Sequence, residues 1–329
     1  MRFSIVTPAY NAANYLKEML DSVRHQTFSD WELRIVDDGS TDDTRRIISE
    51  TAAEDTRIKP VYLQENSGSC FHPRRLAIES SEGEYVVNID ADDMVEPDYL
   101  LKLDECIRTT GADLVYADMY LFGEAMKPAK VLPKGGNPYS RIYNGNRLFG
   151  KTLGRWEVAA VGALDRQLAL KSLALYDSEL TSEKRWNSYD NENLSRADLF
   201  LADKVALCQT AYYYRQTDQS VSHKISTRRF GLLSADMLLC GFTWHHFGPS
   251  SKEYVSANAQ LFHHVIEFMR ILRRHSRKLE LAGAEKIVRK AFKAIDFSVL
   301  KGYVSPIYLA VMNQGYRTSK FILGRYGGN

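Results

Sequence analysis

The sequence predicts an α/β protein in which a mainly parallel sheet is sandwiched by helices and is followed by a helical C-terminal region. Two observations carry this prediction. Through the first 120 residues, short apolar runs alternate with stretches of helical spacing, which is the pattern of repeated βα units. From about residue 228 onward prolines nearly vanish, and apolar residues follow helical spacing, as in Ile287, Ala291 and Ile295. We therefore expect the chain to divide into residues 1–227 and 228–329.

The first two βα units are easy to follow. An apolar run at residues 3–6 predicts a strand, and the apolar residues of the next helix recur at three- and four-residue spacing: Leu16, Met19, Leu20 and Val23. A second strand over residues 31–36 ends at Asp37-Asp38-Gly39. Ser40 and Asp43 stand three residues apart, which predicts a capping box at the start of the next helix.

Two further units complete the regular part of the chain. Residues 59–63 predict a third strand, and a helix is expected over residues 73–80. A buried strand over residues 85–89 then runs directly into Asp90-Ala91-Asp92-Asp93. Strands separated by helices of this length favour parallel pairing, with helices on both faces of the sheet.

Beyond this point the pattern becomes less regular. A helix begins near residue 97 and a strand is expected over residues 113–122. Prolines and a pair of glycines between residues 128 and 138 then mark a loop-rich insertion. Such insertions are common places for substrate-specific walls.

The composition excludes several classes of protein. The 329 residues are 44% hydrophobic and 26% charged with a net charge of +2, which is too apolar and too nearly neutral for a disordered chain. There is no signal-peptide pattern and no apolar run long enough to span a bilayer, so we expect a cytoplasmic protein. The four cysteines lie far apart without a CxxC pair, which argues against a zinc ribbon or a disulfide framework.

The charge is divided unevenly along the chain. Residues 228–329 hold 16 Lys and Arg against 6 Asp and Glu, whereas residues 1–227 hold 27 against 35. An acidic body is typical of carboxylates gathered around a cation. A basic tail favours an anionic partner such as phosphate, nucleic acid or a membrane surface.

Acidic side chains follow separate strands of the predicted sheet. Asp37 and Asp38 come after the second strand, and the Asp90–Asp93 segment comes after the fourth. Ligands of open parallel sheets bind at the carboxyl ends of the strands, so these carboxylates should meet at one edge. Oxygen ligands alone predict Mg²⁺ or Mn²⁺, which commonly bridges carboxylates and a diphosphate. A turn or helix cap at Asp37 and Asp38 is the alternative interpretation.

These segments resemble family 2 of the inverting nucleotide-sugar glycosyltransferases. The resemblance lies in residues 4–11 (SIVTPAYN), residues 36–42 (VDDGSTD) and residues 83–93 (GEYVVNIDADD), and it is specific over about residues 3–120. It weakens through the middle and returns at Tyr189-Asp190 and at residues 212–215. The resemblance implies a glycosyltransferase-A fold of the nucleotide-diphospho-sugar transferase type.

The resemblance also implies roles for individual residues of the N-terminal part. Those implied to contact the nucleotide are Pro8, Tyr10 and Asn11 in the loop against the base, Asp38 on the base edge, and Arg74 at the family's arginine position. Asp92 would bind ribose or assist the metal, and Asp93 would coordinate the Mn²⁺ or Mg²⁺ ion on the diphosphate. Asp90 would orient the turn. Arg75 and Ala77 depart from the family, which usually has asparagine and glycine there.

The catalytic base is expected in a separate segment. Sugar transfer with inversion needs a carboxylate that takes the proton of the acceptor hydroxyl, and a metal-bound carboxylate is a poor base. Asp190 matches the position of the family's base, although Tyr189 stands where the family has glutamate. Glu192 is the second candidate. An acidic helix N-terminus is the alternative interpretation of this segment.

The function that the resemblance implies is transfer of a hexose or N-acetylhexosamine from a nucleotide-diphosphate donor, by default UDP-linked, in the synthesis of surface polysaccharide or glycoconjugate. Residues 1–120 would bind the donor, residues 121–227 would bind the acceptor, and residues 228–329 would form the basic helical region. A catalytically silent sugar-nucleotide-binding module is an alternative. A Rossmann oxidoreductase is disfavoured because no GxGxxG follows the first strand.

The partners expected are a nucleotide-sugar donor and a saccharide or lipid-linked saccharide acceptor, without nucleic acid. Basic residues alternate with apolar ones over residues 270–293, which predicts amphipathic helices that either lie on anionic lipid or cover a dimer or domain contact.

Several single residues carry weaker signals. Arg215 could pair with phosphate and His223 could join the metal, while Trp156 and Trp186 could form the floor of the acceptor site. His245-His246 and His263-His264 lack acidic neighbours in helical register, so no metal is expected there.

Overall fold

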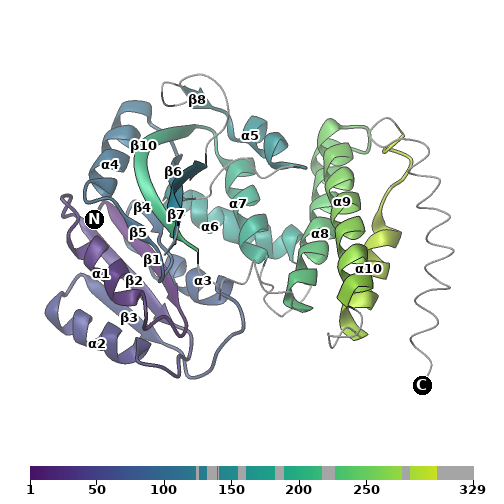
Figure 1. Cartoon of the computed structure of the whole chain (residues 1–329). Helices are drawn as coiled ribbons and strands as arrows, with labels where there is room; N and C mark the ends of the chain where they lie inside the picture. Colours follow the sequence, from purple (N-terminus) through teal and green to yellow (C-terminus); the bar gives the residue numbers. More distant parts are fainter. Residues whose placement is uncertain are drawn as a thin grey trace.

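A computed structural model describes residues 1–123, 126–131, 139, 141–154, 161–181, 189–216, 227–275 and 282–301. In this part of the chain, ten strands form one sheet with helices on both faces, and a helical region follows on one side (Figure 1). The α/β class and the helical C-terminal region that the sequence predicts are confirmed.

The N-terminal half of the sheet is parallel. β1 (Phe3–Ala9) pairs with β2 (Trp31–Asp37) on one side and with β4 (Tyr85–Asn88) on the other, and β3 (Ile58–Tyr62) extends the sheet beyond β2. The chain moves outward from β1 to β3 and then crosses back to β4. This reversal of strand order creates a switch point between β1 and β4, where open α/β sheets bind their ligands.

The second half of the sheet is mixed. β9 (Gly162–Asp165) runs antiparallel between β4 and β6 (Leu114–Gly123), and β10 (Val205–Arg215) pairs with β6 in parallel. Three short strands are antiparallel additions: β5 (Met94–Val95) and β8 (Ile142–Tyr143) on β10, and β7 (Met126–Val131) on β6. The parallel arrangement read from the βα units therefore holds for the first four strands.

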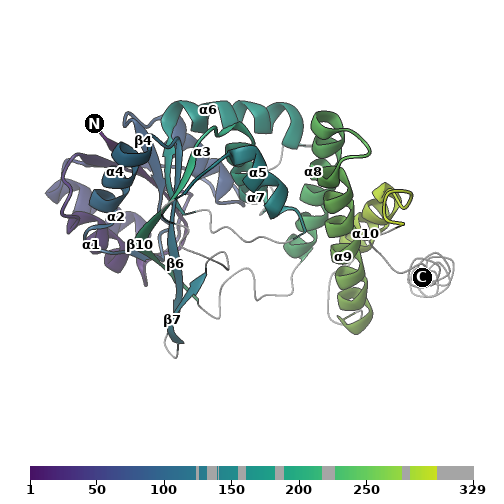
Figure 2. The same ribbon diagram turned by 90° about the horizontal axis from the view of Figure 1, so that it is seen from above.

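Helices cover the two faces of the sheet in separate groups (Figure 2). α1 (Leu16–Arg24), α2 (Thr44–Glu54) and α4 (Tyr99–Thr110) lie on one face, and α3 (Phe71–Glu79), α5 (Gly145–Thr152), α6 (Arg166–Leu175) and α7 (Asp190–Leu201) lie on the other. Neighbouring strand residues point to opposite faces, so Ile5 packs with the first group and Val6 with the second.

The capping box predicted at Ser40 does not form. α2 begins at Thr44 after Asp43, whose side chain makes no capping hydrogen bond, and the Thr44 N–H donates to Asp42 at 3.0 Å. The Ser40 hydroxyl instead accepts the N–H of Asn11 at 3.0 Å. A long-range contact between two loops has replaced the local one.

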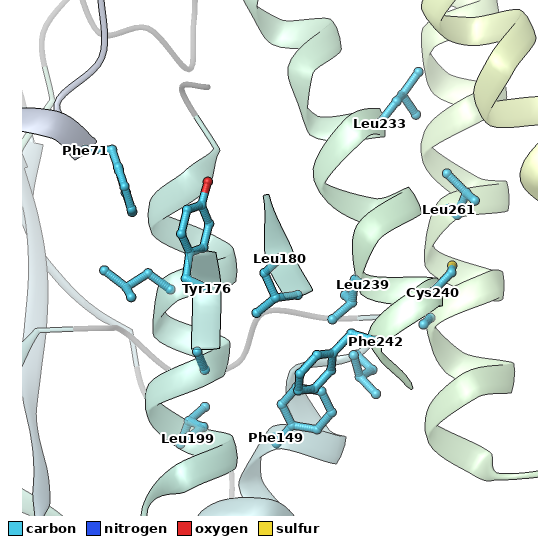
Figure 3. Close-up of a cluster of buried hydrophobic side chains, with 14 of the residues drawn as sticks. Phe71, Phe149, Tyr176, Leu180, Leu199, Leu233, Leu239, Cys240, Phe242 and Leu261 are labelled. Carbon is cyan, nitrogen blue, oxygen red and sulfur yellow. The ribbon is translucent and has the colours of Figure 1, made fainter. Parts of the chain in front are cut away.

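The C-terminal region continues the core of the sheet domain. It contains a short 3₁₀ turn at Thr227–Phe230, α8 (Gly231–Phe247), α9 (Lys252–His275) and α10 (Ala282–Ala294). Buried side chains from α3, from a π-helical segment η2 (Tyr176–Leu180) and from α8 form one apolar cluster that includes Phe71, Tyr176, Leu180 and Phe242 (Figure 3). Side chains on both sides of residue 227 share this cluster, and the domain boundary there stays a prediction.

None of the helices in the described ranges is both long and apolar enough to cross a bilayer.

Candidate functional site

The carboxyl ends of β1, β2 and β4 meet at one edge of the sheet. Ala9 is paired with Asp37, and Val6 of the same strand is paired with Asn88. The loop at Tyr10, the acidic pair at Asp38 and the Asp90–Asp93 turn therefore begin side by side, as their positions after the strands predict. We refer to these three segments as the donor edge.

Asp38 is buried and held by a loop from the next βα unit. Its carboxylate accepts the Ser67 N–H at 3.0 Å, the Ser67 hydroxyl at 2.9 Å and the Asn66 amide at 3.1 Å. Burial raises the pKa of Asp38, and the Ser67 hydrogen bonds oppose that shift by stabilising the charged form. The carboxylate is thereby fixed in one orientation.

Gly39 lets this loop come close enough to reach Asp38. Its φ of +70° lies in the left-handed region, and an added Cβ would stand 2.6 Å from the carbonyl carbon of Glu65. A side chain at position 39 would push the loop away. The glycine after the acidic pair is therefore part of the geometry that fixes Asp38.

The loop after β1 exposes one aromatic ring and fixes one amide. Tyr10 is 49% exposed. Asn11 has a φ of +48°, and its side-chain oxygen accepts the Thr41 N–H at 2.8 Å. Pro8, expected to contact the base, lies buried within β1, where it is paired with Val36. Pro8 therefore supports this loop from within the sheet, and Tyr10 is the member that reaches the surface.

Arg74 and Asp90 form an ion pair between α3 and the turn after β4. Arg74 is 7% exposed, and burial by itself would lower the pKa of its guanidinium, but the interactions with Asp90, Cys70 and Tyr212 together outweigh burial and raise that pKa. Sequence reasoning placed Arg74 near base or phosphate. In the structure, the guanidinium contacts the acidic turn itself and supplies the positive charge that a carboxylate cluster requires.

Asp93 is anchored inside the protein. Its two oxygens accept the Tyr212 hydroxyl at 2.6 Å and the Arg215 N–H at 2.8 Å, and the residue is 1% exposed. Burial, together with the charges of Asp90 and Asp92, raises its pKa well above the usual range. Asp93, which the resemblance implies as a ligand of the ion, therefore has both carboxylate oxygens engaged by residues of β10.

Asp92 differs from Asp93 in its hydrogen bonds. No other described residue donates a hydrogen bond to its carboxylate, whereas its backbone carbonyl accepts the side chain of Arg215 at 2.8 Å. Burial, and after it the negative charge of Asp90, raises the pKa of Asp92 to about 6. The positive charge of Arg215 opposes this shift without cancelling it.

Arg215 is fully engaged at the end of β10. Besides its contacts with Asp92 and Asp93, it donates to Glu18 at 2.6 Å, and its guanidinium lies 4.7 Å from the rings of both Tyr15 and Phe122. Its expected phosphate contact would have to compete with these partners. Arg215 instead ties α1, β6 and the acidic turn together.

Tyr212 and Tyr214 are site residues whose roles sequence reasoning missed. The Tyr212 hydroxyl donates to Asp93 and accepts the Asp90 N–H at 3.0 Å. Burial, and then the charge of Asp93, raises the pKa of Tyr214 to about 12. Their spacing of two residues in a strand places both on one face, which was the signal available in the sequence.

Asp190 lies at the first position of α7 and is 6% exposed. The Tyr176 hydroxyl forms a hydrogen bond to it, and the Tyr176 ring packs on Phe71 of α3 with centroids 4.7 Å apart. The amide of Asn191 donates to the Cys70 sulfur at 3.0 Å. The N-termini of α7 and α3 therefore adjoin, and α3 is the helix whose Arg74 holds the donor edge.

Glu192, the second candidate base, faces the C-terminal helices. It lies 3.6 Å from Arg196, and burial raises its pKa while the charges of Asp236 and His264 also act on it. Asp190 and Glu192 thus have different surroundings, because helical geometry directs residues two positions apart away from each other.

The histidine pairs do have acidic partners, contrary to the expectation from helical register. His264 bonds Asp236 at 2.6 Å, and His246 bonds Glu179 at 2.7 Å. These acids come from other elements, so helical register could not reveal them. His223, Trp156 and Trp186 lie outside the described residues.

The chain is similar in sequence to known proteins. The model of the family described as "Glycosyl transferase family 2" matches residues 4–162. TuaG of Bacillus subtilis strain 168 is 44% identical over 99 residues, which is 30% of this chain and 39% of TuaG. Glycosyltransferase GlyG of Streptococcus pneumoniae serotype 4 is 25% identical over 222 residues, which is 66% of this chain and 72% of GlyG.

A solved structure shares the fold over most of the chain. The structure of Staphylococcus aureus TarS 1-349 in complex with UDP-GlcNAc superimposes with a TM-score of 0.67 at 20% identity and covers 91% of this chain and 83% of that one. The chain spans less than half the length of TuaG and about a fifth of GlyA of S. pneumoniae, with which it shares 30% identity over 148 residues. Over its residues 4–162, the chain therefore resembles glycosyl transferase family 2.

Proposed function

We propose that this protein transfers a hexosyl or N-acetylhexosaminyl group from a UDP-sugar to an acceptor hydroxyl, with inversion at the anomeric carbon. One observation carries the proposal: the contact between Asn191 and Cys70 brings the helix that begins at Asp190 against the helix whose Arg74 holds the donor edge. TarS, whose fold this chain shares, was solved with UDP-GlcNAc, and its name is poly(ribitol-phosphate) beta-N-acetylglucosaminyltransferase. This sugar transfer would serve the synthesis of a surface polysaccharide or glycoconjugate.

The nucleotide would bind between Tyr10 and Asp38. The exposed ring of Tyr10 offers a face on which the base stacks, a contact worth about 1–3 kcal/mol per base. The Oδ1 atom of Asp38 accepts a hydrogen bond from the Ser67 N–H and has a second lone pair. This oxygen can therefore also accept an N–H from the base edge. Asn11 sets the direction of the loop through its bond to Thr41.

A divalent cation fits the acidic turn. The donors are carboxylate oxygens, and the raised pKa of Asp92 marks a local excess of negative charge that Arg74 and Arg215 together do not offset. Asp92, and Asp90 beside it, would hold Mn²⁺ or Mg²⁺, while Asp93 would keep the turn in place through Tyr212 and Arg215. When bound, the ion would neutralise charge on the departing diphosphate.

Asp190 would act as the base. It takes the proton of the acceptor hydroxyl while that oxygen bonds to the anomeric carbon, from the face opposite the bond to phosphate. That bond breaks, its electron pair leaves with the nucleoside diphosphate, and the configuration inverts. The hydrogen bond from Tyr176 holds the Asp190 carboxylate in one rotamer, so that a lone pair can face the acceptor.

Two experiments test the function. Thermal shift with UDP-, GDP- and dTDP-sugars, with and without Mn²⁺, should show a stabilisation that is largest for a UDP-sugar with the ion. Proton NMR of the product should show the inverted anomer. Binding without turnover on any saccharide or lipid-linked saccharide acceptor would indicate the silent binding module instead.

We also propose that the C-terminal helices contact anionic lipid at the inner face of the membrane of a cytoplasmic enzyme. Lys286, Lys290 and Lys293 are exposed at helical spacing on α10, whereas Val288 and Ala291 are buried on its opposite side. Such a basic row is attracted to an anionic surface over about one Debye length. A dimer contact on the same surface stays a prediction.

Sedimentation with vesicles tests this contact. Binding should require phosphatidylglycerol, fall with salt, and be lost when the three lysines are changed together to glutamine. The matched control changes the exposed Lys17, Lys151 and Lys171, which carry the same charge on other helices. Equal binding to neutral and anionic vesicles would contradict the proposal.

A further inference from the structure

Two histidines and a glutamate converge at the junction between η2 and α8. Glu179 belongs to η2, and His245 and His246 belong to the last turn of α8. The His246 Nε2 lies 2.7 Å from the Glu179 Oε2, and ligand atoms of all three side chains lie within 4.8 Å of one another. The cluster is separate from the donor edge and has no part in the mechanism above.

Aromatic packing holds this cluster in place. The His246 ring lies 4.8 Å from the Phe200 ring and 4.4 Å from the Phe242 ring, centroid to centroid. Phe242 and Leu180, the residue next to Glu179, belong to the same buried apolar cluster (Figure 3). Both histidines are exposed, and the contacts with Phe200 and Phe242 set the position of the His246 ring.

Space for a ligand adjoins the cluster. An open cavity of about 480 Å³ is lined by Glu179 and His245, with Met237, Leu238, Gly241 and Phe242 completing its wall. A metal ion held here would keep an open coordination position for water or an exogenous ligand.

We propose that Glu179, His245 and His246 form a binding site for a zinc-class divalent metal ion that joins η2 to α8. Two imidazoles and a carboxylate are ligands that Zn²⁺ and Co²⁺ prefer, in contrast to the oxygen-only donors of the acidic turn. Bonds of about 2.0–2.2 Å in tetrahedral geometry separate ligand atoms by about 3.4 Å. In the structure, the His246 and Glu179 ligand atoms are 2.7 Å apart, and all three ligand atoms lie within 4.8 Å of one another, so these separations span that value. A small movement of Glu179 away from His246 and a rotation of His245 would complete the site.

A metal ion bound at this site would stabilise η2, the segment that contains Tyr176, the hydrogen-bond partner of Asp190. Residues of η2 are already tied to α3 by the paired hydrogen bonds of Arg75 to Asp177 at 2.6 and 2.8 Å. Tyr176, in the same segment, bonds Asp190. A metal on Glu179 would fix the other end of η2 to α8, so its occupancy should raise the melting temperature of the full chain.

Titration of the untagged, full-length protein with Co²⁺ tests the proposal. The titration uses the Asp92→Asn background, which weakens the ion site expected at the acidic turn, so that Co²⁺ bound there is distinguished from Co²⁺ bound at the histidines. Visible absorption should show one nitrogen-ligated Co²⁺ per chain, displaced by Zn²⁺. His245→Ala and Glu179→Gln should each weaken binding at least about tenfold.

His263→Ala is the matched control, because His263 is exposed on α9 and absent from the cluster. Its affinity should equal that of the parent protein, and the circular dichroism of every variant should be unchanged. Zn²⁺ should raise the melting temperature of the parent and the control but not of His245→Ala. Absence of saturable Co²⁺ binding, or equal binding by His245→Ala and the parent, would overturn the proposal.

Discussion

The donor edge and the region around Asp190 are built by different kinds of contact. At the donor edge, the strand ends bring the motifs together, and each motif is a run of a few residues after a buried strand. Around Asp190, single side chains from η2, α3 and α7 meet through the contacts of Tyr176 and of Asn191. The first region is fixed by sheet topology, whereas the second depends on individual long-range contacts.

This difference predicts separate phenotypes for the two regions. Changes at the donor edge should affect nucleotide binding or stability, and changes at Asp190 should affect turnover alone.

The largest effect is expected from Asp190→Asn. The amide keeps the shape of the carboxylate but cannot take the acceptor proton, and loss of general-base catalysis lowers kcat by about 10³-fold. The KM for the UDP-sugar should be unchanged, because Asp190 lies outside the donor edge. Steady-state kinetics checks both numbers, and Glu192→Gln is the control. Retained turnover in Asp190→Asn would move the base to another residue.

A second effect concerns the stability of the sheet. Burial alone would raise the pKa of Glu32, but hydrogen bonds from Ser4, Lys59 and Arg34 hold it at about 2. Because the folded pKa is depressed, this stabilisation is present above about pH 4.5 and is lost as the pH falls toward 2. It amounts to about 3 kcal/mol.

Denaturation of Glu32→Gln in urea measures this contribution. The variant should be less stable than the parent at pH 7, and the gap should narrow below pH 4. Glu50→Gln removes a carboxylate from an exposed ion pair and is the control. A gap that stays constant with pH would show that the effect of Glu32 is not ionic.

A smaller and more specific effect separates the two neighbouring aspartates. Asp92→Asn should weaken Mn²⁺-dependent UDP binding about tenfold or more without changing the melting temperature, because its carboxylate faces the expected ion. Asp93→Asn should lower the melting temperature, because the amide offers one acceptor oxygen to two donors, the Tyr212 hydroxyl and the Arg215 N–H. Calorimetry of UDP binding with Mn²⁺, and a thermal melt without it, check the pair. The reverse pattern would identify Asp93 as the metal ligand.

The sequence could predict the features that depend on neighbouring residues. Helices α1 and α3, the strands before Asp38 and Asp90, and the meeting of those aspartates at one edge all follow from apolar spacing and strand order. These features can be predicted without knowing which residues far apart in the chain contact each other.

The features that were missed all depend on residues far apart in the chain. The antiparallel β9 enters the sheet between β4 and β6, and no local pattern marks it. The Ser40 hydroxyl accepts the N–H of Asn11 and does not cap α2. The partners of His246 and His264 come from Glu179 and Asp236, which lie on other elements. Such contacts are decided by packing after the elements have formed.

The central claim is that the donor edge and Asp190 act on one substrate. A crystal structure of the Asp190→Asn variant with UDP-sugar and Mn²⁺ tests it most directly. The account predicts the base beside Tyr10 and Asp38, the diphosphate and ion at Asp92, and the anomeric carbon facing position 190. A nucleotide bound at the acidic turn with its sugar directed away from α7 would contradict it.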